Sequence, residues 1–264
     1  MSGSKASVAT LRSVVELLDR SRRLVVLTGA GMSQESGVPT FRDELSGLWA
    51  NFDPAELATE SAFRKNPARV FGWYVARLRK VRAAEPHHGY LSLVALEDRF
   101  DQLTVITQNV DGLHSRAGSS SVLEIHGSLE RFRCLDAAHP YEYHPPPRGE
   151  ESSEDIEPPV CTVCGSLIRP GVVWFGEILP ERVVQQAWDA ASKADAMMVI
   201  GTSAEVYPAA DLPRVAAESG AAVIELNPMS TPLSRTANYC LRETAAGGLE
   251  AINYALAGAK KDDG

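Results

Sequence analysis

Residues 24–33 read LVVLTGAGMS. Four apolar residues run directly into Thr-Gly-Ala-Gly, which is typical of a buried parallel strand that ends in a tight loop. The same pattern returns in LTVITQN (103–109), MMVIGTS (197–203) and AAVIELN (221–227). Helical patterns separate these strands, as at 8–20, 181–193 and 209–218. Alternating strands and helices predict an α/β fold with a doubly wound parallel sheet, covered by helices on both faces.

The four predicted strands all end in polar or glycine residues. Ligands of parallel sheets bind beyond the carboxyl ends of the strands. Turn formation alone also calls for such residues. Four polar strand ends together nevertheless favour a binding crevice at this edge of the sheet.

Two stretches break the alternation. Residues 40–90 carry helical pieces without a strong strand, and residues 129–169 contain three of the four cysteines. The run PPPRGEESSEDIEPP (145–159) is too polar to bury and predicts a mobile loop. We expect one domain over 1–264, whose large part consists of residues 8–39, 91–128 and 170–256. A smaller inserted module would contain a helical lobe (40–90) and a cysteine-containing, zinc-ribbon-like lobe (129–169). Residues 257–264 would form a disordered tail.

Composition limits the classes of partner. With 44% hydrophobic and 23% charged residues the chain can bury a core. The net charge of −8 argues against nucleic acid as a partner, but it allows a basic peptide. No apolar run reaches the ~18 residues of a membrane span, and no secretory signal is visible. Few, clustered cysteines do not form a disulfide scaffold. We expect a cytoplasmic protein, a monomer or weak oligomer, that binds no membrane.

The loop after the first strand is a candidate phosphate site. Its glycines, Gly29 and Gly31, would let backbone N–H groups approach a phosphate at the start of the next helix. As a dinucleotide fingerprint it is incomplete, because Gln34 replaces the third glycine. A plain tight turn is the alternative.

Three further segments contain side chains that could bind a ligand or take part in catalysis. In the loop 35–43, Arg42 can pair with phosphate and Phe41 can shield a reactive centre, although a docking loop would look alike. Asn109 and Asp111 follow a strand and could bind ribose hydroxyls or an amide. His126 lies beside a glycine in an otherwise apolar strand, and imidazole takes protons near neutral pH. A structural, hydrogen-bonded histidine is the alternative.

Seven blocks occur in the order and spacing of the sirtuin family: GAGMSQESGVPTFRD, TQNVDGLH, EIHGS, the C-x-x-C pair, RPGVVWFGE, GTS and ELN. The chain therefore resembles sirtuins over about residues 10 to 255. The resemblance implies a Rossmann-like fold and an enzyme that consumes NAD to remove acyl groups from protein lysine. The products would be nicotinamide, O-acyl-ADP-ribose and free lysine, and the partners would be acylated proteins or peptides.

The resemblance also implies roles for individual residues. His126 would be the general base that takes a proton from the nicotinamide ribose hydroxyls. The residues expected to bind NAD are Gly29, Ala30, Gly31, Ser33, Phe41, Arg42, Gln108, Asn109, Asp111, Gly201, Thr202, Ser203, Asn227 and Ala245. The segment with Val172, Trp174 and Phe175 would pair with the substrate peptide as an added strand.

Tyr74 and Arg77 are three residues apart on a predicted helix and so share one face. They resemble the Tyr-x-x-Arg signature of the sirtuin branch that accepts succinyl, malonyl or glutaryl lysine. A hydroxyl and a guanidinium together make a receptor for a carboxylate. The alternative is an amphipathic helix with a surface arginine.

The chain departs from the family at its metal module, where relatives carry two C-x-x-C pairs. Cys134, Cys161 and Cys164 supply three ligands of the four that structural zinc requires. His139 could be the fourth, with Asp136 and His144 as weaker choices, or the module folds without zinc. A second departure is Tyr90, where many relatives carry His, and there we expect only a packing effect.

Two other functions compete with deacylation. A protein of this kind could mainly transfer ADP-ribose, or it could sense NAD without catalysis. Tyr74 and Arg77 favour the deacylase over the transferase, and a scaffold would need neither His126 nor Asn109 and Asp111.

Overall fold

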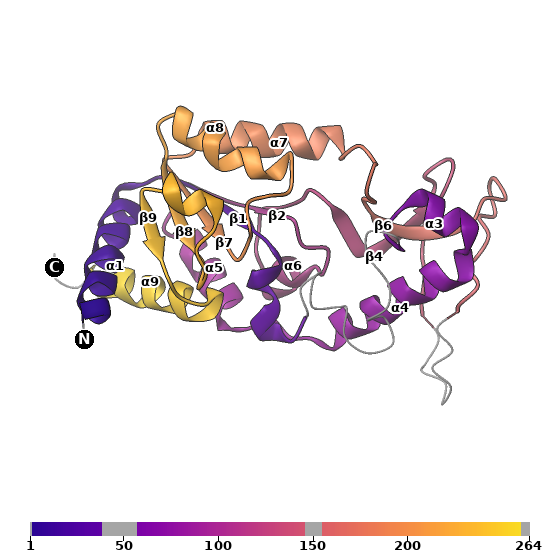
Figure 1. Ribbon diagram of the computed structural model, residues 1–264, viewed down its shortest axis with the longest axis horizontal. Helices are drawn as coiled ribbons and strands as arrows, with labels where there is room; N and C mark the ends of the chain where they lie inside the picture. Colours follow the sequence, from indigo (N-terminus) through magenta and orange to yellow (C-terminus); the bar gives the residue numbers. More distant parts are fainter. Residues whose placement is uncertain (1, 39–56, 146–154, 260–264) are drawn as a thin grey trace.

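The large lobe is built on a six-stranded sheet in which every paired strand is parallel to its neighbour (Figure 1). The computed structural model describes residues 2–38, 57–145 and 155–259. The strand order is β3-β2-β1-β7-β8-β9, the order of doubly wound dinucleotide-binding sheets. The strands are β1 (Arg23–Thr28), β2 (Gln102–Thr107), β3 (Val122–Glu124), β7 (Ala196–Ile200), β8 (Ala222–Leu226) and β9 (Tyr239–Leu241). The predicted fold class is confirmed.

Helices cover both faces of this sheet. Side chains alternate across β1, so Leu24 and Val26 join one buried cluster while Val25 and Leu27 join another. The first cluster is closed by α1 (Ser2–Arg20), α5 (His88–Glu97) and α9 (Ala245–Ala259). The second is closed by α7 (Glu181–Ser192) and α8 (Leu212–Glu218), which lie above the sheet in Figure 1. Strands buried on both faces explain the continuous apolar runs of the sequence.

The small lobe has its own core. It contains α3 (Glu60–Lys65), α4 (Pro67–Ala83) and an antiparallel sheet in the order β5-β4-β6, with β4 (Gly127–Cys134), β5 (Pro140–Tyr141) and β6 (Ile168–Val172). Aromatic side chains of α3 and α4 pack on this sheet, among them Phe63, Phe71 and Trp73. Asn66 accepts a hydrogen bond from the Arg69 N–H, and the proline that follows it fits the first helical turn of α4.

Several predicted boundaries shift. β6 pairs with β4, so residues 170–172 lie in the small sheet and not in the large one. Helix α5 starts at His88 and packs against α9 in the large lobe. Helix α9 continues to Ala259, so 257–259 are helical where a disordered tail was expected. Residues 146–154, the middle of the predicted mobile loop, lie outside the described residues.

Among the helices of the described ranges, none combines the length and the apolar character needed to cross a lipid bilayer.

Candidate functional site

A cleft of about 1400 Å³ runs along the carboxyl ends of the large sheet and reaches the small lobe. It is lined by every predicted cofactor and substrate residue within the described part of the chain, together with His126: Gly29, Ala30, Gly31, Ser33, Tyr74, Arg77, Gln108, Asn109, Asp111, Val172, Trp174, Phe175, Gly201, Thr202, Ser203, Asn227 and Ala245. Phe41 and Arg42 lie outside the described residues. The chain thus brings these distant segments to one cavity.

The glycines at the strand ends let two loops pack against each other. A Cβ on Gly31 would lie 2.8 Å from Gly201 Cα, and one on Gly29 would lie 2.6 Å from Thr202 Cβ. Gly201 has a φ of +58°, which favours glycine. The Gly31 N–H donates to the Gly201 carbonyl over 2.8 Å. This loop therefore uses part of its backbone to join the ends of β1 and β7, a role that sequence reasoning did not foresee.

A buried polar cluster lies at the inner end of the cleft. The Ser33 hydroxyl donates to Asp111 Oδ2 over 2.6 Å and lies 2.8 Å from the Tyr90 hydroxyl. The Asn109 amide donates to Ser33 Oγ and to the Gly29 carbonyl, each over 2.9 Å. Burial raises the pKa of Asp111, although hydrogen bonds from Ser33 and the Leu113 N–H oppose the shift. Ser33, Asn109 and Asp111 are therefore held in fixed orientations towards the cleft.

Tyr90 is a member of this cluster that sequence reasoning treated only as a packing change. Its side chain is fully buried and its ring contacts the rings of His87 and His114. Its hydroxyl, through Ser33, is connected to Asp111. In the sequence, this position is a tyrosine in the first turn of an apolar helix, and that polar hydroxyl was the indication of a place in the cluster.

His126 lies in the turn between β3 and β4, not within a strand as predicted. Its Nδ1 lies 3.0 Å from the Gln108 carbonyl. Because a carbonyl only accepts, neutral His126 carries its proton on Nδ1, which leaves Nε2 as the basic nitrogen. Burial lowers the pKa of His126, and the bond to Gln108 opposes this shift. The imidazole is consequently neutral near pH 7, as a general base must be.

His114 differs from His126: it is fully buried, whereas His126 is half-buried. His114 does not line the cleft, and its Nε2 lies 3.0 Å from Thr28 Oγ1. Burial, with a contribution from His87, lowers the pKa of His114 to about 3. His114 is therefore a neutral structural residue, which was the alternative considered for His126.

Comparison with known proteins identifies the family. A sequence model of the Sir2 family matches residues 29–208. The chain belongs to the Sir2 family. It is similar to NAD-dependent protein deacylase 1 of Pseudomonas aeruginosa, with 49% identity over 88% of this chain and 93% of that protein. It is 51% identical to the NAD-dependent protein deacylase of Mycobacterium tuberculosis, over 87% of this chain and 96% of that protein. The crystal structure of a Sir2 homologue in complex with NAD superposes with a TM-score of 0.86 at 42% identity, covering 94% of each chain.

In this Sir2-family chain the wall of the cleft that α4 and the segment after β6 form is rigidly braced. Tyr74 is buried on α4, and its hydroxyl accepts a hydrogen bond of 2.9 Å from Trp174 Nε1. The buried Arg169 stacks its guanidinium over the Trp174 ring and makes an ion pair with Glu177. Glu177 also accepts from the Trp174 N–H over 2.8 Å. The segment after β6 is therefore held by Tyr74 of α4 and by Arg169 of β6.

The same segment is attached to the candidate base. The Val173 N–H donates to the His126 carbonyl over 2.9 Å. Phe175, further along, is 54% exposed, unlike Val172 and Trp174, which are buried. His126 and the predicted peptide-binding residues are thus neighbours in the backbone network.

Four potential metal ligands of the Sir2-family small lobe converge. The ligand atoms of Cys134, His139, Cys161 and Cys164 all lie within 4.8 Å of one another. His139 Nδ1 is 3.6 Å from both Cys134 Sγ and Cys161 Sγ, and Cys164 Sγ is 3.7 Å from Cys134 Sγ. With Zn–S of about 2.3 Å and Zn–N of about 2.0 Å, a tetrahedral zinc holds such sulfur pairs about 3.8 Å apart and nitrogen–sulfur pairs about 3.5 Å apart. The donor set and its spacing fit zinc.

The two weaker candidates for the fourth ligand lie apart from this cluster. Asp136 pairs with Arg64 over 2.7 Å and accepts from Ser166 over 2.8 Å. His144 is 80% exposed beside Glu142. Sequence spacing alone did not decide among the three residues.

Proposed function

We propose that this chain removes acyl groups from lysine side chains of proteins at the expense of NAD, and that it prefers lysines with acidic acyl groups such as succinyl and malonyl over acetyl. The relatives named NAD-dependent protein deacylase support the general reaction. The acyl preference has a separate basis in this chain's own cleft. The observation that carries it is that Tyr74 and Arg77 line the same cleft as His126.

The cleft suits a dinucleotide and a peptide together. Its volume of about 1400 Å³ exceeds the ~300–1,000 Å³ of sites for a single drug-sized ligand. We assign the pyrophosphate to the loop Gly29–Ser33, and the adenosine half to Gly201–Ser203, Asn227 and Ala245. The nicotinamide and its ribose would face Gln108, Asn109 and Asp111, near Phe41 and Arg42 of the neighbouring loop. When bound, NAD supplies an electrophilic sugar carbon whose leaving group is nicotinamide.

His126 would act as the general base. Its Nε2 would accept a proton from a ribose hydroxyl, and the Gln108 carbonyl would stabilise the positive charge that then forms on the ring. A site of this kind must exclude water, or the dinucleotide would be hydrolysed without transfer. Asn109 and Asp111, which line the inner end of the cleft, are themselves buried, and this supports the exclusion of water there.

The edge of the small sheet would hold the substrate backbone. Within the described residues β6 has a neighbouring strand, β4, on one side only. The segment Val172–Phe175 continues from this edge along the cleft. A peptide added as a further strand binds mainly through its main chain, which allows many sequences. The acidic net charge would favour lysine-rich targets.

The acyl preference would come from charge. Arg77 lies half-buried on α4, with its guanidinium 4.8 Å from the centre of the Trp73 ring and 5.8 Å from that of Tyr74. A succinyl or malonyl carboxylate would pair with this guanidinium and with the Tyr74 hydroxyl. An acetyl group would give neither residue a charged partner.

The test compares matched peptides that carry acetyl-lysine or succinyl-lysine. Arg77→Met should lower kcat/KM for the succinyl peptide by roughly 10- to 100-fold, as expected for a charge-assisted bond of about 1.5–3 kcal/mol, with a much smaller effect on the acetyl peptide. Arg79→Met on the same helix, which does not line the cleft, is the matched control. Equal losses for both peptides in Arg77→Met would contradict the acyl preference.

We further propose that zinc holds the small lobe through Cys134, His139, Cys161 and Cys164. The ion would be structural, since four protein ligands leave no open position. Among the described residues that line the cleft, we find no feature that favours the alternatives to deacylation, which are ADP-ribosyl transfer and NAD sensing without catalysis. A cytoplasmic location and a monomeric or weakly oligomeric state stay predictions.

A further inference from the structure

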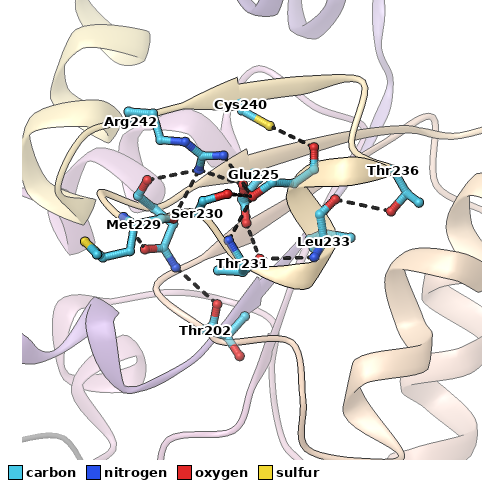
Figure 2. Close-up of polar contacts among 11 residues, drawn as sticks. Thr202, Glu225, Met229, Ser230, Thr231, Leu233, Thr236, Cys240 and Arg242 are labelled. Atoms are coloured by element: carbon cyan, nitrogen blue, oxygen red, sulfur yellow. Dashed lines mark hydrogen bonds and ion pairs between the residues drawn. The ribbon is translucent and has the colours of Figure 1, made fainter.

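A buried carboxylate sits in the central sheet directly before the adenosine side of the cleft. Glu225 on β8 is 1% exposed, in a strand whose other described positions are apolar. An unpaired buried carboxylate is costly, so its partners indicate what it does. These partners come from the segment that follows β8 and from the residue after β9, and Figure 2 labels two of them, Thr231 and Arg242.

Three donors converge on this carboxylate. Arg242 Nη1 and Ser234 Oγ each donate to Glu225 Oε2 over 2.6 Å, and the Thr231 hydroxyl donates to Oε1. Burial alone would raise the pKa of Glu225, but these hydrogen bonds outweigh it and lower the pKa, so the group is ionised at neutral pH. Thr231 also begins the short helix η6 (Pro232–Arg235), where a reciprocal bond pair with Ser234 closes a capping box.

Arg242 extends the network to the backbone. Its Nη1 donates to the carbonyls of Asn227 and Met229, each over 3.2 Å. The Asn227 side chain in turn donates to the Thr202 carbonyl over 3.1 Å and accepts from the Met229 N–H over 3.0 Å. The ion pair thus holds the loop after β8, and the Asn227 side chain joins that loop to Thr202 in the loop after β7.

This tied loop is a wall of the cleft. Residues 226–232 line the cleft without a gap, as do Thr202 and Ala245. Sheet stability alone does not account for the ion pair, because replacing such pairs by apolar residues is often neutral or stabilising. A loop held in its binding shape, by contrast, loses less conformational entropy when a ligand arrives.

We propose that Glu225 and Arg242 are positioning residues for the dinucleotide: they hold the Asn227–Thr231 segment in the shape that binds the adenosine half. This inference rests on the proposed function, since it takes NAD as the co-substrate and Asn227 as a contact to it. Neither residue lines the cleft, so the effect is on affinity and not on the chemical step.

The experiment measures ADP-ribose affinity by calorimetry, and kcat and KM for NAD at saturating acyl peptide, for the full chain. Glu225→Gln keeps the shape and removes the charge. Its Kd for ADP-ribose and its KM for NAD should both rise roughly tenfold, the factor that corresponds to about 1.4 kcal/mol, with kcat and the KM for peptide unchanged. Glu218→Gln, which removes an exposed ion pair with Arg214 on α8, should match the wild type.

A second variant covers the case in which Glu225→Gln does not fold. Ser234→Ala leaves the carboxylate and the guanidinium paired and should give a smaller rise in the same two constants. A folded variant that binds ADP-ribose as the wild type does, or that loses kcat with an unchanged KM for NAD, overturns the positioning role. Failure of the wild type to bind ADP-ribose overturns the proposed function itself, so the two failures are distinguishable.

Discussion

His126 illustrates how the surroundings of a single side chain set its chemical state. The sequence offers six histidines and no way to know which nitrogen of any of them is protonated. The Gln108 carbonyl fixes the proton on Nδ1, and burial lowers the pKa. A neutral imidazole with its lone pair on Nε2 is the result, and the Val173 N–H attaches its backbone to the segment after β6.

The pH dependence of deacylation follows from this arrangement. Since the neutral form is the active base and its pKa lies below the ordinary 6.5, kcat should fall on acidification through that lowered pKa and be level at neutral pH. His126→Ala should lose most of its kcat, by roughly 10²- to 10⁴-fold. The check is a pH–rate profile with saturating NAD and peptide. Full turnover in His126→Ala would remove the histidine from the mechanism.

Gly31 is important because the neighbouring backbone leaves no space for a side chain at this position. An alanine Cβ there would meet backbone atoms of Gly201 at 2.8 and 2.9 Å. Gly31→Ala should therefore lower the free energy of unfolding by about 1–3 kcal/mol, as overpacking does. Gly258→Ala, where a Cβ meets nothing within 4 Å, is the control and should be neutral or slightly stabilising. Chemical denaturation measures both, and equal unfolding free energies for the two variants would refute the close-packing argument.

Single residues also mark the limit of sequence reasoning. The Tyr90 hydroxyl meets Ser33, 57 residues away in the chain, and the Glu225 carboxylate meets Arg242, 17 residues away, so neither contact follows from the local sequence pattern. Glu225 did leave a signal, because a carboxylate interrupts an apolar strand. His139 was one of three candidates until the chain brought it against Cys134 and Cys161.

At the scale of elements, the strands that the sequence predicted are those buried on both faces. β1, β2, β7 and β8 read as mostly apolar runs, which is typical of a parallel sheet between two helical layers. The edge strands β3 and β9 have three residues each and few fully buried ones, so their sequences resemble loops. The turn that carries His126 was predicted as strand because it lies between β3 and β4 without a break in the pattern.

The cysteine-containing part of the small lobe allows a specific prediction of metal content. The purified protein should contain about one zinc per chain, the content of a single four-ligand site. His139→Ala should lower that content and the thermal stability, whereas His144→Ala, which changes an exposed side chain, should not. Elemental analysis and thermal unfolding check this. Zinc-free protein with an intact small lobe, or unchanged zinc in His139→Ala, would rule out the ligand set.

At the scale of the molecule, the site exists because two lobes meet along one edge of a sheet. Loops after β1, β2, β7 and β8 supply the inner wall, and α4 with the segment after β6 supplies the outer wall. The strand order places the chain's first strand beside β7, so segments more than 150 residues apart share one cavity. The sequence predicted the participants, but their joint geometry depends on this topology.

Product analysis by mass spectrometry is the most direct test of NAD-dependent deacylation in this cleft. The protein would be incubated with NAD and a succinyl-lysine peptide. We predict equal amounts of nicotinamide, free-lysine peptide and O-succinyl-ADP-ribose, formed more efficiently than the acetyl counterparts with the matched acetyl peptide. Nicotinamide released while the peptide keeps its acyl group, or ADP-ribose found attached to protein, would contradict it.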